Sequence, residues 1–223
     1  MPVILLLLFI VLFTGPGLWV RYVMKRHGQP IPDMPGTGGE LAEHLIERFG
    51  LEGVRVTEAP QGVNAFDYNQ RQVLLSPDIY HGKSLTAVAV AAHEVGHAIQ
   101  HARQEPLVRW HIRLWPLATT LQQVARWMIL ALPLILLLFR APQLMLPAAL
   151  LFVGALVTSA LLKAVLLPLE WDASFNKALP ILREGYIPDH AVPAVRQVLR
   201  AAALTYATST LFDILLIWRL IRR

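Results

Sequence analysis

The sequence contains no cysteine, and its charged residues are few. Without a thiol among its 223 residues, the chain can form no disulfide framework, thiolate metal site or cysteine nucleophile, so histidine and carboxylate would have to hold any metal. Charged residues make up 16% and hydrophobic residues 55%, and the mean hydropathy is +0.49, a balance far from that of a soluble domain. The net charge of +5 comes from arginines beside apolar stretches, which indicates membrane anchoring and not nucleic-acid binding.

Four apolar stretches are long enough to span a bilayer, or nearly so, because a membrane helix needs about 20 residues. They are residues 2–20, 124–139, 144–167 and 201–217. The first stretch has neither a basic leader nor a cleavage site and is followed at once by Arg21, so it is predicted to be a signal anchor. We therefore expect a mostly helical membrane protein with about four transmembrane helices.

Only "RAPQ" (140–143) separates the second and third stretches, which predicts a tight hairpin. Residues 21–123 and 168–203 would then lie on the same side of the membrane. Basic residues flank that side, so the positive-inside rule predicts that it faces the cytoplasm. The terminal "RLIRR" disagrees with this rule, and whether the last stretch crosses fully stays open.

This topology divides the chain into five predicted parts. They are a signal anchor (1–26), a cytoplasmic core (27–123), a transmembrane hairpin (124–167), a helical segment that supplies a third metal ligand (168–200) and a C-terminal membrane segment (201–223).

The core has the patterning of a soluble α+β domain. A Pro/Gly linker at 27–39 precedes an amphipathic helix at 40–49. "GVRVTEA" is a predicted strand, and "VNAFDY" and "RQVLLS" form a predicted hairpin around Asn69-Gln70. Ser84 is the predicted N-cap of the next helix, whose apolar residues recur at spacings of three and four.

This last helix carries "HEVGH", the spacing typical of metalloproteases. His93 and His97 lie on one helix face about one turn apart, so both imidazoles can reach a single Zn²⁺. Glu94 is placed to take a proton from a water bound to that metal. The alternative is a His-rich structural helix. His101 lies about 12 Å along the axis from His93, too far to share the ion, and His111, among tryptophans and arginines, is predicted to be an interfacial anchor.

A catalytic zinc needs a third protein ligand and one open position. The best carboxylate is Glu170 in "LPLEWDASFNKAL", where an apolar stretch ends and a polar helix begins. The alternative for Glu170 is an ordinary helix N-terminal carboxylate. Asp172 could instead orient one of the histidines. Asp213 is the rival ligand, because a carboxylate within an apolar stretch is a functional candidate.

The stretches "SLTAVAVAAHEVGHAIQHA", "LLSPDIYHGKS", "LEWDAS" and "RAAALTY" together resemble the YugP-type neutral zinc metallopeptidases of bacterial membranes, over about residues 37–206. More distantly, they resemble membrane gluzincins of the HtpX and CAAX-prenyl endopeptidase type. The resemblance implies one catalytic zinc ion held by His93, His97 and Glu170, with Glu94 as the general base.

The resemblance also implies an edge strand that holds extended substrate, with Asn64, Ala65 and Phe66 on it. One position departs from the HtpX-like pattern. Those relatives carry an aspartate four residues beyond the ligand glutamate, where this chain has Ser174. Asp172 is the residue that could replace its support of a histidine.

The histidine helix is too short and too polar at its end to span a bilayer, because only residues 85–92 precede His93 as an apolar run. The sequence therefore predicts a small α+β gluzincin-like zinc-protease core at the membrane surface. The expected function is a zinc endopeptidase that acts on peptide or membrane-protein substrates at the cytoplasmic face of the bacterial inner membrane, anchored in the lipid bilayer as a multi-pass protein. Two alternatives remain. One is a non-hydrolytic metal-binding adaptor or regulator of other membrane proteins, and the other is a transporter in which Asp213 and the row of histidines serve ion movement.

Overall fold

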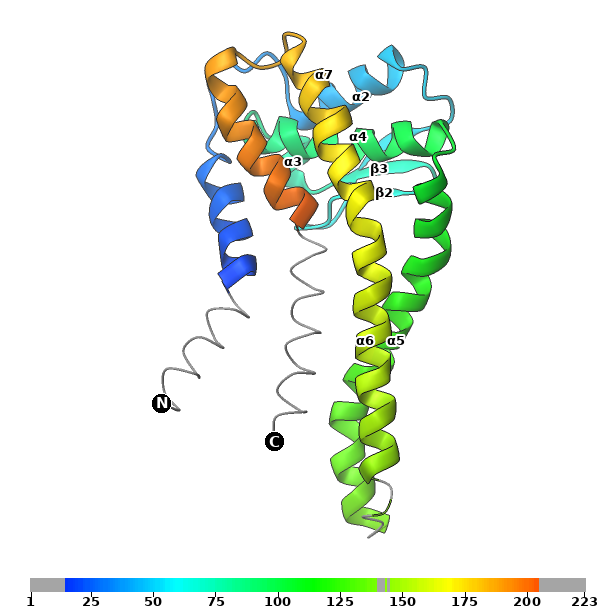
Figure 1. The fold of residues 1–223 in the computed structure, drawn as a ribbon. Coiled ribbons are helices and arrows are strands. Elements are labelled where there is room, and N and C mark those ends of the chain that lie inside the picture. The colour runs from blue at the N-terminus through cyan, green and yellow to red at the C-terminus, as the bar shows by residue number, and fades with distance from the viewer. Residues whose placement is uncertain (1–14, 140–142, 144, 205–223) are drawn as a thin grey trace. The chain divides into compact units, whose positions relative to one another are not determined.

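A computed structural model describes residues 15–139, 143 and 145–204, which are mostly helical and include one small sheet (Figure 1). The described residues form two compact units. The first unit contains residues 15–109 and 168–204, and the second contains the described residues between 110 and 167. Every residue of the candidate metal centre belongs to the first unit.

The sheet of the first unit has three short strands: β1 (Arg55–Glu58), β2 (Ala65–Asp67) and β3 (Gln72–Leu75). Their order is β1-β3-β2, with β1 parallel and β2 antiparallel to β3. Val73 and Leu75 of β3 are buried while Gln72 and Leu74 are half-buried, as expected for a strand with one face on a core. The predicted strand and hairpin are thus confirmed, and β2 is an edge of the described sheet.

Helix α2 (Gly38–Arg48) begins with a capping box, which fixes its first turn. The Thr37 side chain accepts a hydrogen bond from the Glu40 backbone N–H at 3.2 Å, and the Glu40 carboxylate accepts one from the Thr37 N–H at 2.8 Å. This confirms the helix predicted at 40–49, with its start two residues earlier. The four-residue helix α3 (Pro77–Tyr80) follows β3.

Helix α4 (Leu85–Ala102) is the central helix of the first unit. Its cap is the predicted one, because the Ser84 hydroxyl accepts a hydrogen bond from the Ala87 backbone N–H at 3.1 Å. Every residue from Thr86 to Gln100 is buried. A helix that is apolar on nearly all sides has to be covered on all sides, and α2, α3, the sheet and a later helical segment contact α4.

That later segment follows helix α6 (Met145–Trp171) without a break. A π-helix, η2 (Asp172–Ala178), leads into α7 (Leu179–Arg183), the short turn η3 (Asp189–Ala191) and a helix over residues 192–204. Its apolar side chains, including Leu182, Val195 and Leu199, are buried in the same core as α4. The C-terminal part of the described chain thereby completes the unit that the N-terminal part begins.

The second unit contains most of α5 (Pro106–Phe139) and of α6. Polar contacts between described residues join these helices. The Ser159 hydroxyl donates to the Ala118 carbonyl at 3.1 Å, and the Lys163 ammonium donates to the Gln122 side chain at 3.0 Å. Large apolar residues of α6 are exposed, with Leu146 at 70% and Leu161 at 63%, unlike those of a buried core helix.

The expectation of about four transmembrane helices is wrong. Within the described residues, one helix, Met145–Arg183, is long and apolar enough to cross a membrane. The stretch 124–139 covers only about 24 Å at about 1.5 Å per residue, short of the roughly 30 Å of a hydrocarbon core. Most of the predicted stretches 2–20 and 201–217 lies outside the described residues. The five predicted domain boundaries stay predictions.

Candidate metal centre

Helix α4 brings three polar side chains into the core of the first unit. His93, Glu94 and His97 are only 3%, 6% and 5% exposed. The imidazole rings of His93 and His97 lie 4.7 Å apart between centroids, one helical turn from each other, as the spacing predicted. Buried polar groups need hydrogen-bond or charge partners. The end of α6 supplies a carboxylate that pairs with both imidazoles.

Glu170 is the next-to-last residue of α6, and its side chain is 1% exposed. The π-helix η2 begins two residues later, and π-helical turns are found frequently at functional sites. Gly96 allows η2 to approach α4 closely, because a Cβ at this position would lie 2.9 Å from the Ala173 carbonyl oxygen. A glycine between the two histidines therefore lets the chain carry Glu170 to them.

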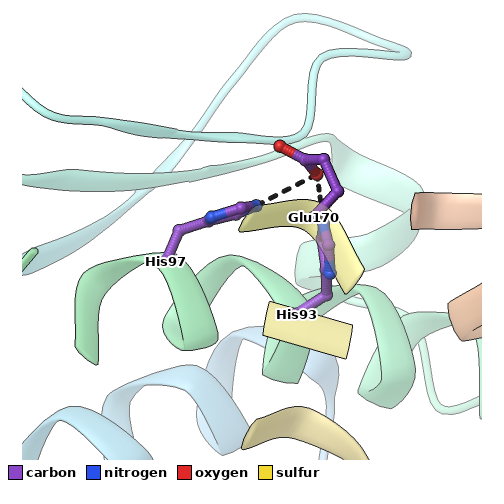
Figure 2. Close-up of side chains that lie close together, drawn as sticks. All are labelled: His93, His97 and Glu170. Carbon is purple, nitrogen blue, oxygen red and sulfur yellow. Dashed lines mark ion pairs between the residues drawn. The ribbon is translucent and has the colours of Figure 1, made fainter. Parts of the chain in front are cut away.

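The three side chains form a compact group (Figure 2). The Glu170 Oε2 atom lies 3.4 Å from His93 Nε2 and 3.3 Å from His97 Nε2. Ligand atoms around a tetrahedral zinc with bonds of about 2.0–2.1 Å are about 3.3–3.4 Å apart. Neither carboxylate oxygen of Glu170 has a hydrogen-bond partner among the described residues. A buried carboxylate in this state is suited to a cation, and the three residues could hold one metal ion.

The pKa values of His97 and Glu94 are both shifted by the charges buried in this site. Burial alone would lower the pKa of the His97 imidazole, but the nearby Glu170 carboxylate raises this pKa to about 9. The buried Glu170 carboxylate therefore favours positive charge at the imidazoles, and a bound metal ion would supply that charge. Burial raises the pKa of Glu94, a shift that the two imidazoles oppose. A carboxyl group with a raised pKa is a stronger base than an exposed glutamate.

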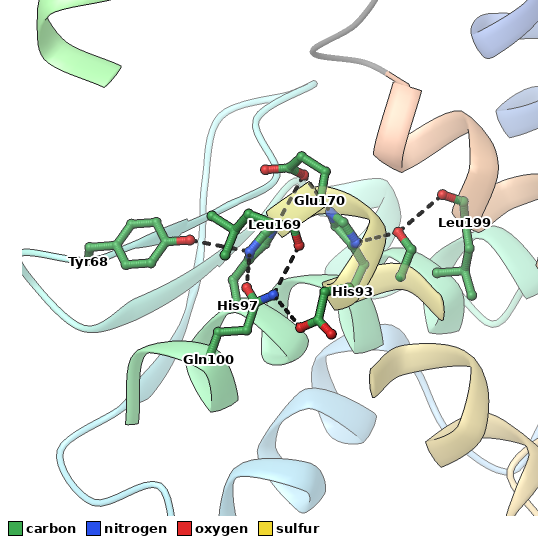
Figure 3. A network of polar contacts seen from close by, with 9 residues as sticks. Tyr68, His93, His97, Gln100, Leu169, Glu170 and Leu199 are labelled. Carbon is green, nitrogen blue, oxygen red and sulfur yellow. Dashed lines mark hydrogen bonds and ion pairs between the residues drawn. The ribbon is translucent and has the colours of Figure 1, made fainter. Parts of the chain in front are cut away.

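A hydrogen-bond chain fixes the orientation of His93 (Figure 3). The Ser174 hydroxyl donates to the Leu199 carbonyl at 3.2 Å and lies 2.9 Å from His93 Nδ1. Since the hydroxyl proton is engaged with Leu199, the oxygen accepts from Nδ1–H. The Nε2 atom that faces Glu170 then carries the lone pair that a metal would need. Ser174 itself thus supports the histidine, whereas Asp172 was expected to replace the aspartate that the HtpX-like relatives carry at this position.

A second series of hydrogen bonds fixes the orientation of His97. The fully buried Gln100 side chain donates through its NH₂ group to the Leu169 carbonyl at 2.9 Å and to the Asp172 carboxylate at 2.8 Å. Its carbonyl oxygen therefore faces His97 Nδ1, 2.9 Å away, and accepts from the Nδ1–H. The Tyr68 hydroxyl lies 3.2 Å from the same nitrogen. The sequence analysis had proposed Asp172 as a partner of a histidine, and the structure places Gln100 between Asp172 and His97.

The residues predicted for substrate binding lie on or next to the edge strand β2. The side-chain oxygen of Asn64 accepts hydrogen bonds from the Ser76 backbone N–H at 2.9 Å and from its hydroxyl at 3.0 Å. Ala65 and Phe66 belong to β2, and the polar backbone of Phe66 lies close enough to Glu94 to oppose the rise that burial causes in the pKa of its carboxyl group. The strand therefore lies next to the candidate general base.

The remaining candidates are separate from this group. The ring of His101 lies 5.7 Å from those of Phe66 and Tyr68, at the edge of the site. His111 belongs to the second unit and stacks on Trp115 with ring centroids 5.6 Å apart. Asp213 lies outside the described residues. Sequence reasoning found the three central side chains but missed Gln100 and Gly96, whose roles depend on contacts with a distant segment.

The chain is similar to known zinc metallopeptidases over nearly its whole length. The family model described as "Putative neutral zinc metallopeptidase" matches residues 2–223. A protein from Bacillus subtilis (strain 168) named "Putative membrane protease YugP" is 30% identical over 208 residues, which cover 90% of this chain and 88% of that protein. No solved structure matches the chain. The matches over nearly its whole length show that the chain belongs to the neutral zinc metallopeptidase family of YugP type.

Proposed function

We propose that the protein is a membrane-bound zinc endopeptidase in which His93, His97 and Glu170 hold one catalytic zinc ion. The observation that carries this proposal is the buried Glu170 carboxylate, which lacks a hydrogen-bond partner among the described residues and lies 3.3 and 3.4 Å from two imidazole nitrogens. Two histidines and one glutamate leave one position of a tetrahedral ion open, as catalytic zinc sites require. The printed name of the Bacillus relative, a membrane protease, supports the same assignment.

The residues around the ion have separable roles in this proposal. Bound zinc would supply Lewis acidity, which polarises a peptide carbonyl and makes a water molecule nucleophilic at neutral pH. Glu94 would accept a proton from the attacking water and would pass it to the leaving amine. Ser174 and Gln100 hold the two imidazoles with their Nε2 atoms toward the ion.

We further propose that substrate binds along β2 as an extended peptide. This strand pairs on one side with β3 and is an edge of the described sheet. An extended peptide can add to such an edge through backbone hydrogen bonds, which gives affinity that depends little on sequence. The influence of the Phe66 backbone on the pKa of Glu94 supports this arrangement, because a peptide on β2 would then run beside the general base.

We propose that the metal centre faces the cytoplasm and acts on peptide bonds close to the membrane, in peptides or in membrane proteins. Arg21, Lys25 and Arg26 lie on the helix of residues 15–26, which belongs to the same unit as the metal centre. Basic residues beside apolar segments are enriched on the cytoplasmic side. The exposed leucines of α6 support contact with the lipid bilayer.

The decisive experiment replaces the proposed base without touching the proposed ligands. Glu94→Gln keeps the shape of the side chain but removes its ability to accept a proton. We expect one zinc per chain in both proteins, and casein cleavage reduced about 10²–10⁴-fold in the variant. Full cleavage by Glu94→Gln would refute the enzyme mechanism. Zinc binding without cleavage in the unaltered protein would favour the adaptor alternative.

A further inference from the structure

A hollow of about 570 Å³ lies on the first unit, formed by η2, α7 and the helix of residues 192–204. Its size falls within the 300–1,000 Å³ or so that is usual for ligand sites. None of its lining residues belongs to the group of candidate metal ligands and their hydrogen-bond partners. The hollow combines two kinds of surface, one cationic and one apolar.

Three arginines form the cationic part: Arg183, Arg196 and Arg200. Arg196 and Arg200 are four residues apart on one helix, so they present their side chains on the same face. All three are exposed, and within the described part of the chain none has an ion pair or a side-chain hydrogen bond. Arginine binds phosphate oxygens through two parallel N–H groups, and is suited to this better than lysine.

Two carboxylates also border the hollow, and they do not cancel the positive charge. Glu184 is paired with Arg48, whose guanidinium lies 2.5 Å from the Glu184 carboxylate. Asp189 therefore remains as the one negative lining residue without an ion pair among the described residues. Because the described lining residues include three arginines and only one carboxylate without an ion pair, the hollow can attract an anion.

The apolar part consists of Trp171, Phe175 and Leu179, together with the neighbouring Pro180. Trp171 is 50% exposed, and its ring centroid lies 4.3 Å from that of Phe175. Trp171 is also the last residue of α6 and follows the apolar run that ends at Leu167 by four residues, about 6 Å along a helix. Tryptophan at the end of an apolar helix is typical of the membrane interface.

We propose that this hollow binds the headgroup of an anionic membrane phospholipid. The arginines would contact the phosphate group, while Trp171 and Phe175 would pack against the glycerol and the first acyl carbons. A free phosphate ion would use the arginines but not the aromatic surface. Because Trp171 directly follows Glu170, a lipid bound here would hold the metal centre close to the bilayer surface. This proposal is independent of whether the centre hydrolyses peptides.

The test is native mass spectrometry of the full-length protein in detergent, with phosphatidylglycerol and phosphatidylcholine added in equal amounts. We expect the protein to retain phosphatidylglycerol at least fivefold more than phosphatidylcholine. The double variant Arg196→Gln/Arg200→Gln should lose this retention at least tenfold, and Arg196→Lys/Arg200→Lys should be intermediate. Arg183→Gln gives a second, single-site test at the exposed end of α7.

The matched control is Arg55→Gln/Arg103→Gln, which removes the same charge from two exposed arginines outside the hollow. It should retain phosphatidylglycerol as the unaltered protein does, and thermal unfolding should show that all variants are folded. Three results would overturn the proposal: equal retention of both lipids, equal loss in the control pair, or unchanged retention in Arg196→Gln/Arg200→Gln and in Arg183→Gln. Displacement of the lipid by an equal concentration of inorganic phosphate would overturn it too, because the ligand would then be a free anion.

Discussion

Gly96→Ala tests whether the close packing of α4 on η2 positions the metal centre. The added Cβ would lie 2.9 Å from the Ala173 carbonyl oxygen and 3.3 Å from its Cα atom. Both atoms belong to backbone, so no side chain can rotate away, and η2 has to move. Ala173 is three residues beyond Glu170 and next to Ser174, so this movement separates both from α4.

Two effects on the free energy of unfolding oppose each other in this variant. Alanine is favoured over glycine within a helix by about 1 kcal/mol. Forcing extra volume into a packed core costs about 1–3 kcal/mol. We expect a net loss of stability of up to about 2 kcal/mol. Zinc affinity should fall as well, because Glu170 moves from its positions 3.3 and 3.4 Å from the imidazoles.

The matched control is Gly154→Ala in α6, where a Cβ would have no neighbour within 4 Å. There only the helix preference acts, so stability should be unchanged or slightly increased. The assays are thermal unfolding of both variants and competition for zinc with a chelator of known affinity. If Gly96→Ala binds zinc and unfolds like the control, the close approach at Gly96 does not position the centre.

Three further predictions concern the surroundings of the site. Ser174→Ala removes the acceptor of His93 Nδ1–H and should weaken zinc binding about 10–100-fold in the chelator assay; unchanged affinity would mean that His93 needs no such support. Ala65→Pro removes a backbone donor from β2 and should reduce peptide cleavage while zinc content stays at one per chain; normal cleavage would exclude this edge as the substrate site. A cysteine introduced at the exposed Gln61 should resist a membrane-impermeant thiol reagent in intact cells and react after lysis; the reverse pattern would place the centre outside.

Local signals made much of the first unit predictable. The N-caps Thr37 and Ser84 and the spacing of apolar residues indicate where α2 and α4 lie, because these signals act within one or two turns. The hairpin of β2 and β3 was predictable for the same reason. The spacing of His93 and His97 sets their common direction by helix geometry alone.

Long-range features were not predictable in the same way. The contact of Gln100 with Leu169 and Asp172 joins residues about seventy positions apart, and no local pattern marks it. π-Helices are rare, and no local pattern in "DASFNKA" predicted η2. The prediction of four transmembrane helices failed because it accepted stretches that only nearly reach the length of a membrane span. Residues 124–139 are apolar over about 24 Å, and within the described residues only Met145–Arg183 is long and apolar enough to cross.

The central claim is that Glu170 completes a zinc site with His93 and His97. The most direct test measures zinc content by elemental mass spectrometry. The unaltered protein, Glu170→Ala and Asp213→Ala are purified side by side for this measurement. We expect one zinc per chain in the unaltered protein and in Asp213→Ala. In Glu170→Ala we expect a loss of zinc affinity well beyond the roughly 10–100-fold that removal of a supporting residue would cause. Zinc retained by Glu170→Ala but lost from Asp213→Ala would contradict this claim.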